Sequence, residues 1–238
     1  MPAVWIYWAV SLTMVTYASA YIVRKHREHG FAALTAFYVI YLGASQIIAA
    51  RQIQFDLGFT AFFAPAAVFI YPFIAQAIDM INEVYGIKKT RLAIAIAFIT
   101  QVLLVIFILM TNTLKPAPFF GYEDAWQSLF GLSVRITFAS WVAFLINQNV
   151  DAWVFAKLKE KLPKQVLLRS ASSDIADLTL DSLIFIPLAF AGTGMPLTPL
   201  IVGQIVSKNI VGLLDTPWFL WYKRMIGSEA LQGGGKGD

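Results

Sequence analysis

The sequence predicts an all-α membrane protein, a polytopic bundle of about seven transmembrane helices, from three observations. The 238-residue chain is 58% hydrophobic and only 13% charged, whereas a soluble domain is about 25% charged. Its mean hydropathy is +0.67. Several stretches of about 20 residues carry almost no charge, which is the length needed to cross a bilayer. A soluble domain would need a polar exterior that this chain does not supply.

Seven segments are long and apolar enough to span the roughly 30 Å of hydrocarbon in a bilayer. They lie near residues 4–23, 31–50, 60–82, 90–113, 130–155, 172–192 and 197–221. The first span ends in YASA (17–20), which resembles a signal-peptidase site. A signal peptide carries its positive charge before the apolar region, and here the charge follows it, so we expect a retained helix.

Positive charge alternates along the connections between these spans. The loops at 24–29, 86–91 and 157–169 are basic, and Lys223 and Arg224 follow the last span. Fourteen of the 18 Lys and Arg residues thereby fall on one side. The positive-inside rule predicts that the N-terminus lies outside and the C-terminus in the cytoplasm. The net charge of +4 then reflects topology, and no nucleic-acid partner is expected.

The domain organisation follows from the same pattern. We expect an extra N-terminal helix with its basic loop (1–30), a six-helix core (31–225) and a flexible C-terminal tail (226–238). The chain has no Cys, and both histidines, His26 and His29, stand in a basic loop. No metal and no cofactor are expected.

Acidic residues inside the apolar segments are the strongest functional signal. An Asp at the centre of a lone membrane helix costs about 2.5 to 3.5 kcal/mol, so such residues should face protein or water. The seven acids within or beside spans are Asp79, Glu83, Asp151, Asp174, Asp177, Asp181 and Asp215. Helical spacing places Asp79 with Glu83, and Asp174 and Asp177 with Asp181, in two stripes. We predict that they line an interior.

The predicted topology brings most of these acids to one layer in the cytoplasmic half of the bundle. Two cations inside spans, Arg135 and Lys208, are the expected partners of the deeper acids. Glu83 is explained as well by pairing with neighbouring basic residues as by ligand contact, and Asp174 as well by helix capping. Aromatic side chains share spans with the polar stripes. Such a cavity suits a flat heterocycle that stacks and donates hydrogen bonds, such as a nucleobase.

Four separated segments resemble the queuosine precursor transporter family, which is related to the vitamin uptake transporters. They are YPFIAQAIDMINEVYG, RITFASWVAFLINQNVDAWVFAKLK, DSLIF and KNIVGLLDTP. The resemblance covers residues 35–225 and carries over Pro72, Phe73, Asp79, Glu83, Gly86, Arg135, Ser140, Gln148, Asp151, Asp181, Lys208 and Pro217. It implies uptake of a 7-deazaguanine, such as 7-cyano-7-deazaguanine, by a core of six spans in the cell membrane.

Taken together, stripes and resemblance give one set of predicted substrate-binding residues. The set is Phe73, Asp79, Asn82, Glu83, Arg135, Asn147, Gln148, Asp151, Asp177, Asp181 and Lys208. Three functions compete. A transporter of a nucleobase-like solute is favoured over a substrate-binding subunit that needs an ATP-driven module, as in energy-coupling-factor transporters. A membrane enzyme is disfavoured because HExxH, GxSxG and Walker motifs are absent from the sequence. An energising partner and a homo-oligomer stay open.

Overall fold

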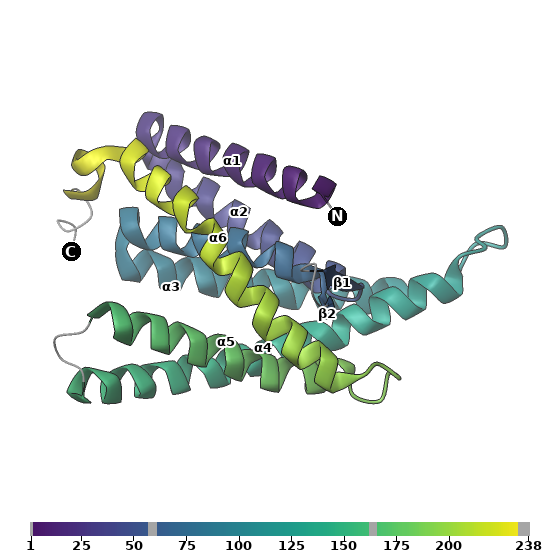
Figure 1. The fold of residues 1–238 in the computed structure, drawn as a ribbon. Helices are drawn as coiled ribbons and strands as arrows, with labels where there is room; N and C mark the ends of the chain where they lie inside the picture. The colour runs from purple at the N-terminus through teal and green to yellow at the C-terminus, as the bar shows by residue number, and fades with distance from the viewer. Residues whose placement is uncertain (1, 57–60, 162–165, 233–238) are drawn as a thin grey trace. The chain divides into compact units, whose positions relative to one another are not determined.

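The computed structural model describes residues 2–56, 61–161 and 166–232, without the side chains of residues 2–3, 55–56, 147–161, 166–177 and 228–232. This part of the chain forms six α-helices, a β-hairpin and a short 3-10 helix (Figure 1). It divides into two compact units. Unit 1 comprises Met1–Ser45, Phe69–Met110 and Val211–Asp238, and unit 2 comprises Gln46–Val68 and Thr111–Ile210.

Unit 1 is built from α1 (Pro2–Lys25), α2 (Arg27–Ile48), α3 (Tyr71–Asn112) and the C-terminal part of α6 (Leu197–Gln232). The first two helices meet in a tight turn at His26, whose backbone N–H donates to the Ile22 carbonyl at 2.8 Å. Apolar side chains from all four helices close one core. Its fully buried members include Val23, Leu34, Ile81 and Tyr222.

Helix α3 folds back on itself at Gly86. A straight helix of 42 residues would be about 63 Å long, twice the thickness of the hydrocarbon layer. Gly86 has φ 75° and ψ 174°, a positive φ that favours glycine. Ala77 precedes Gly86 in the sequence and Ala97 follows it, yet both pack in one buried cluster. A straight helix would hold them far apart. The predicted break between the spans 60–82 and 90–113 therefore falls at Gly86, as a sharp kink between two helical limbs.

Unit 2 contains β1 (Gln52–Asp56), β2 (Ala61–Pro65), α4 (Glu123–Lys161), α5 (Val166–Phe190) and the N-terminal part of α6. It also contains the 3-10 helix η1 (Ala66–Phe69) except its last residue, which belongs to unit 1. Helices α4 and α5 pack along each other (Figure 1). Ile136 on α4, Ile186 and Phe190 on α5 and Leu200 on α6 form its buried core.

The strands pair as an antiparallel hairpin, and β2 crosses α6 at Gly203. Gln52 pairs with Pro65 and Gln54 with Phe63. A Cβ atom on Gly203 would lie 1.9 Å from the Phe63 carbonyl oxygen, so only glycine fits this contact. The hairpin corrects the predicted span 60–82: the first part is strand and 3-10 helix, and α3 begins only at Tyr71. Pro65 stands at the end of β2 and Pro72 in the first turn of α3, which are positions where proline is well tolerated.

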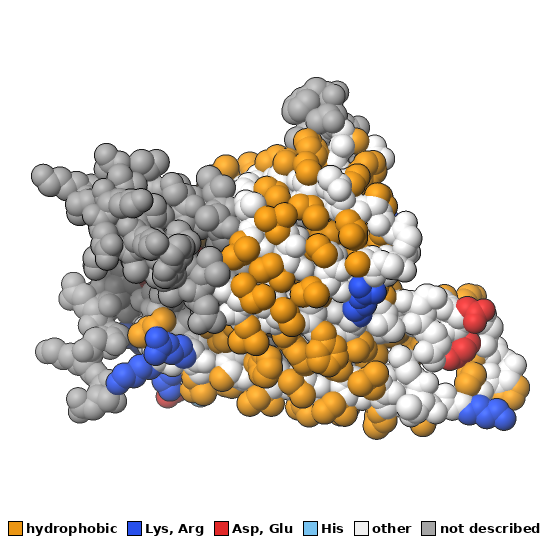
Figure 2. Space-filling model, turned by 90° about the horizontal axis from the view of Figure 1, so that it is seen from below, with side chains coloured by type: hydrophobic (Ala, Val, Ile, Leu, Met, Phe, Trp, Pro, Cys, Tyr) orange, Lys and Arg blue, Asp and Glu red, His pale blue; other side chains and the backbone are white. Residues whose placement is uncertain are grey.

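Five of the described helical segments are long and apolar enough to cross a membrane: Val4–Lys25, Arg27–Ile48, Tyr71–Asn112, Glu123–Ile146 and Leu197–Gly227. Leu178–Phe190 is a shorter apolar stretch. Figure 2 shows a face on which hydrophobic side chains gather and charged ones are few. Large apolar side chains are exposed along α1, α3 and α4, among them Tyr7, Met14, Ile99 and Leu145. The helical membrane bundle is confirmed. Seven crossings and the orientation of the termini stay predictions.

Candidate functional site

Asp181 on α5 and Lys208 on α6 form an ion pair inside unit 2, in which Lys208 Nζ donates to Asp181 Oδ2. The two side chains are only 23% and 13% exposed, respectively. The turn after Phe190 places α5 and α6 antiparallel, with Gly192 and Gly194 at φ 78° and 82°. The ion pair confirms the prediction that Lys208 partners one of the deeper acids.

Gln204 completes this arrangement, and sequence reasoning missed it. Its Nε2 donates to Asp181 Oδ2 at 3.3 Å. Its Oε1 is buried and has no hydrogen-bond partner among the described residues. Gln204 stands four residues before Lys208, on the same helical face, so the spacing rule would have found it had it been applied to the neighbours of Lys208. We call Asp181, Gln204 and Lys208 the Asp181 cluster.

Arg135 on α4 does not pair with a carboxylate as predicted, so far as the described residues show. Its Nε donates to the Leu188 carbonyl at 2.8 Å and its NH2 nitrogen to the Ala191 carbonyl at 2.7 Å. These carbonyls lie at the end of α5, where the last turn lacks helical hydrogen-bond donors and a cation is favourable. Among the described residues Arg135 therefore caps α5, while the side chains of Asp151, Asp174 and Asp177 lie outside them, so a pairing of Arg135 with one of these acids stays a prediction.

Glu83 and Asp79 lie in the first limb of α3, in unit 1. Glu83 Oε1 forms a salt bridge with Lys223 Nζ of α6 at 2.8 Å, so its partner is a basic residue from a distant part of the sequence. Asp79 is exposed and lies close enough to Asp215 of α6 for their charges to interact. Asp215 is buried, 8% exposed, and its backbone carbonyl accepts a bond from Gln76 Nε2 at 3.0 Å. Asp215 was not in the predicted set.

Asn82 is exposed and belongs to the fold at Gly86. Thr90 Oγ1 lies 3.4 Å from Asn82 Oδ1 and 3.1 Å from the Gly86 carbonyl oxygen, so its single hydroxyl proton is shared between these two acceptors. These bonds join the two limbs of α3. The structure thus gives Asn82 a role in holding the two limbs of α3 together, next to the stripe that contains Asp79 and Glu83.

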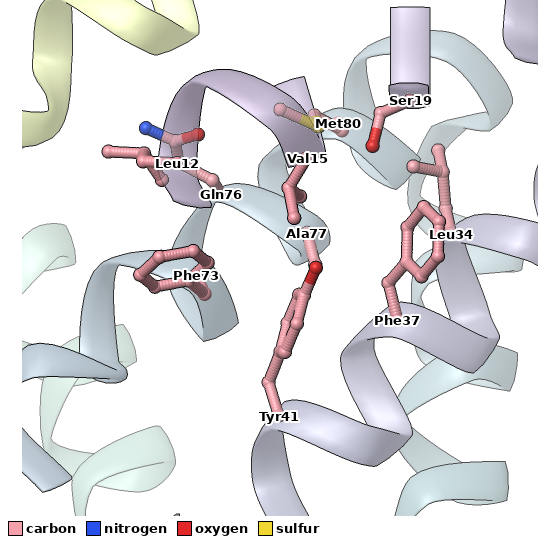
Figure 3. Close-up of a pocket in the computed structure, with 10 residues that line it drawn as sticks. All are labelled: Leu12, Val15, Ser19, Leu34, Phe37, Tyr41, Phe73, Gln76, Ala77 and Met80. Atoms are coloured by element: carbon pink, nitrogen blue, oxygen red, sulfur yellow. The ribbon is translucent and has the colours of Figure 1, made fainter. Parts of the chain in front are cut away.

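Phe73 lines a small pocket between α1, α2 and α3, which we call the Phe73 pocket (Figure 3). Its wall consists of Leu12, Val15, Ser19, Leu34, Phe37, Tyr41, Phe73, Gln76, Ala77 and Met80. The rings of Tyr41 and Phe73 meet edge to face, with centroids 5.5 Å apart. Ser19 Oγ and Gln76 Oε1 are buried without a hydrogen-bond partner among the described residues. The pocket has room for about one water molecule, so it is closed to a nucleobase in this conformation.

The predicted residues thus fall into separate groups. Phe73, Asp79, Asn82 and Glu83 lie in unit 1, and Arg135, Asp181 and Lys208 in unit 2. The side chains of Asn147, Gln148, Asp151 and Asp177 lie outside those that the structure describes.

A family model described as "Putative vitamin uptake transporter" matches residues 65–222. The chain belongs to this family. A "Probable queuosine precursor transporter" from Bacillus subtilis (strain 168) is 24% identical over 204 residues, which cover 84% of this chain and 88% of the relative. No solved structure matches the chain. The resemblance to the queuosine precursor transporters is confirmed.

Membership of this transporter family accounts for the apolar helices. The chain is a multi-pass membrane protein and a transporter with a small-molecule substrate. The matched region begins at the hairpin and ends in α6, so it contains both the Asp181 cluster and the α3 stripe.

Proposed function

We propose that the protein imports a 7-deazaguanine, such as 7-cyano-7-deazaguanine, across the cell membrane into the cytoplasm. The printed name of the Bacillus subtilis relative supports a queuosine precursor as substrate. The observation that carries the proposal is the Asp181 cluster, since ionisable side chains within apolar helices are costly and usually functional.

The chemistry of the cluster fits the edge of a guanine-like ring. That edge carries an amino group and a ring N–H, both donors, beside a carbonyl acceptor. The carboxylate of Asp181 and the buried Oε1 of Gln204 can accept from the donors, and Lys208 can donate to the carbonyl. A ligand N–H would also give Gln204 Oε1 the partner that a buried amide oxygen needs.

The Phe73 pocket in unit 1, taken by itself, also has a lining that suits a flat ligand. Phe37, Tyr41 and Phe73 surround it, and Gln76 presents an unpartnered amide oxygen (Figure 3). Aromatic rings with a few polar atoms are the usual wall of a site for a flat ligand. Because it has room for about one water, a substrate would enter it only in a more open conformation.

The remaining predicted contacts, Asn147, Gln148, Asp151 and Asp177, are retained as proposals. So is the orientation, with the basic loops facing the cytoplasm. In that orientation Glu83 and Lys223 lie near the cytoplasmic side, where a solute would leave.

The queuosine content of tRNA, measured in cells that cannot make queuosine precursors, tests this function. Cells expressing the protein should incorporate queuosine into tRNA when 7-cyano-7-deazaguanine is supplied at a concentration that leaves control cells unmodified. Asp181→Asn should reduce that incorporation, while Lys115→Gln, in an exposed loop, should not. Equal modification with and without the protein would contradict the proposal.

A further inference from the structure

One end of unit 1 carries a hollow of about 420 Å³ whose lining contains none of the predicted substrate-binding residues. It is lined by Tyr17, Ala20, Tyr21, Arg24 and Lys25 of α1 and by Met225 of α6. The α1 residues are spaced by three and four positions, so they lie on one helical face. The C-terminal part of α6 lies beside the end of α1 (Figure 1), and Ala20 and Ile226 share a buried cluster there.

The chemistry of the hollow changes along α1. Tyr17 and Tyr21 are 58% and 46% exposed, and Arg24 and Lys25 are exposed in the last turn. Lys25 Nζ lies 5.6 Å from the centre of the Tyr21 ring. Neither Arg24 nor Lys25 forms an ion pair with a carboxylate that the structure describes. The hollow therefore offers two cations above an aromatic and apolar floor.

The same end of unit 1 gathers basic residues from other elements. Tyr85 Oη donates to the Arg27 carbonyl at 3.0 Å, which ties the α3 fold to the start of α2. Lys89 lies 5.1 Å from the ring of Phe31, and Lys223 pairs with Glu83. Tyrosines next to Lys and Arg at helix ends are typical of the boundary between hydrocarbon and headgroups.

We infer that this hollow binds the headgroup of an anionic phospholipid, with one acyl chain along the exposed face of α1. Arg24 and Lys25 contact the phosphate, and Tyr21 contacts the glycerol region. Two observations favour a lipid over a soluble anion. The hollow opens beside exposed apolar side chains, including Met14 at 67% and Val10 at 53%. Its cations stand at the end of a membrane-length helix, and basic pockets between such helices bind anionic lipids.

The test is native mass spectrometry of the purified full chain, with phosphatidylglycerol or phosphatidylcholine added in turn. The wild-type protein should retain phosphatidylglycerol in preference to phosphatidylcholine. The double variant Arg24→Gln/Lys25→Gln should reduce that preference about thirtyfold, equivalent to about 2 kcal/mol for the two basic residues near a charged membrane surface. An excess of inorganic phosphate should not displace the lipid.

The matched control is the double variant Arg51→Gln/Lys115→Gln, which removes the same charge from exposed residues outside the hollow. It should retain phosphatidylglycerol like the wild type. Tyr21→Leu keeps the apolar floor and should weaken retention less than the double variant does. Equal loss in both double variants, no preference in the wild type, or displacement by phosphate would overturn the inference.

Discussion

Lys208 on α6 donates a hydrogen bond to Oδ2 of Asp181 on α5, and both side chains lie mostly out of solvent. The pair joins two helices of a membrane protein at the position where the sequence predicted a cation and an acid to meet. Breaking one partner of such a pair leaves the other charge uncompensated, whereas removing both charges does not. Stability and transport can therefore be separated by a double-mutant cycle.

We expect Asp181→Asn and Lys208→Gln each to lower the free energy of unfolding, by up to about 3 kcal/mol for a part-buried pair. The double variant Asp181→Asn/Lys208→Gln should recover much of that loss and yet remain inactive, because the solute loses its charged contacts. Thermal unfolding in detergent and uptake assays measure the two effects. A double variant that is both stable and fully active would limit the pair to a structural role.

Gly203→Ala should destabilise the packing of β2 on α6. The added Cβ would lie 1.9 Å from the Phe63 carbonyl oxygen, a backbone atom that cannot rotate away. Overpacking of this kind costs about 1 to 3 kcal/mol. Gly212→Ala, on the same helix but with no atom within 4 Å of its Cβ position, is the matched control and should be neutral or slightly stabilising. Equal melting temperatures for the two variants would contradict the close approach.

Arg135→Ala should loosen the end of α5. It removes the donors to the Leu188 and Ala191 carbonyls, and hydrogen bonds from a charged group contribute about 1.5 to 3 kcal/mol. Hydrogen–deuterium exchange should rise around residues 188–194, and Arg135→Lys should restore part of the protection. Lys115→Ala, in an exposed loop, is the control. Unchanged exchange in Arg135→Ala would argue that the cap is not needed.

The membrane orientation can be tested on the natural sequence background, because the chain contains no Cys. In intact cells, an impermeant thiol reagent should label Gly121→Cys and leave Lys88→Cys unlabelled. Both positions are exposed in the structure, so access to solvent does not differ between them. Labelling of Lys88→Cys alone would invert the predicted topology.

Much of the fold could be predicted from the sequence because charge and apolar length are strong signals in a membrane protein. The helix break at Gly86 and the meeting of Asp181 with Lys208 followed from residue type and spacing. The β-hairpin did not, because residues 61–69 are as apolar as a membrane helix, and only Pro65 hinted otherwise. Hydropathy alone does not distinguish a buried strand from a helix.

The candidate site was harder to predict than the fold. Arg135 was assigned to a carboxylate because charge pairing is the first expectation for a buried cation, yet the carbonyls at the end of α5 serve as well. Gln204 and Gln76 were overlooked, although the predicted set held other amides (Asn82, Asn147 and Gln148), because nothing in the sequence marks these two glutamines as buried. Their importance depends on burial and on which atoms lack partners, and only the three-dimensional structure supplies both.

Uptake of labelled 7-cyano-7-deazaguanine by liposomes that contain only the purified protein tests the central claim most directly. We expect uptake above that of protein-free liposomes without ATP or a second protein. Unlabelled 7-deazaguanines should compete and adenine should not, and Asp181→Asn should reduce uptake about tenfold, equivalent to roughly 1.4 kcal/mol. Uptake that appears only when an ATP-driven module is reconstituted with the protein would contradict a self-sufficient transporter and identify a substrate-binding subunit instead.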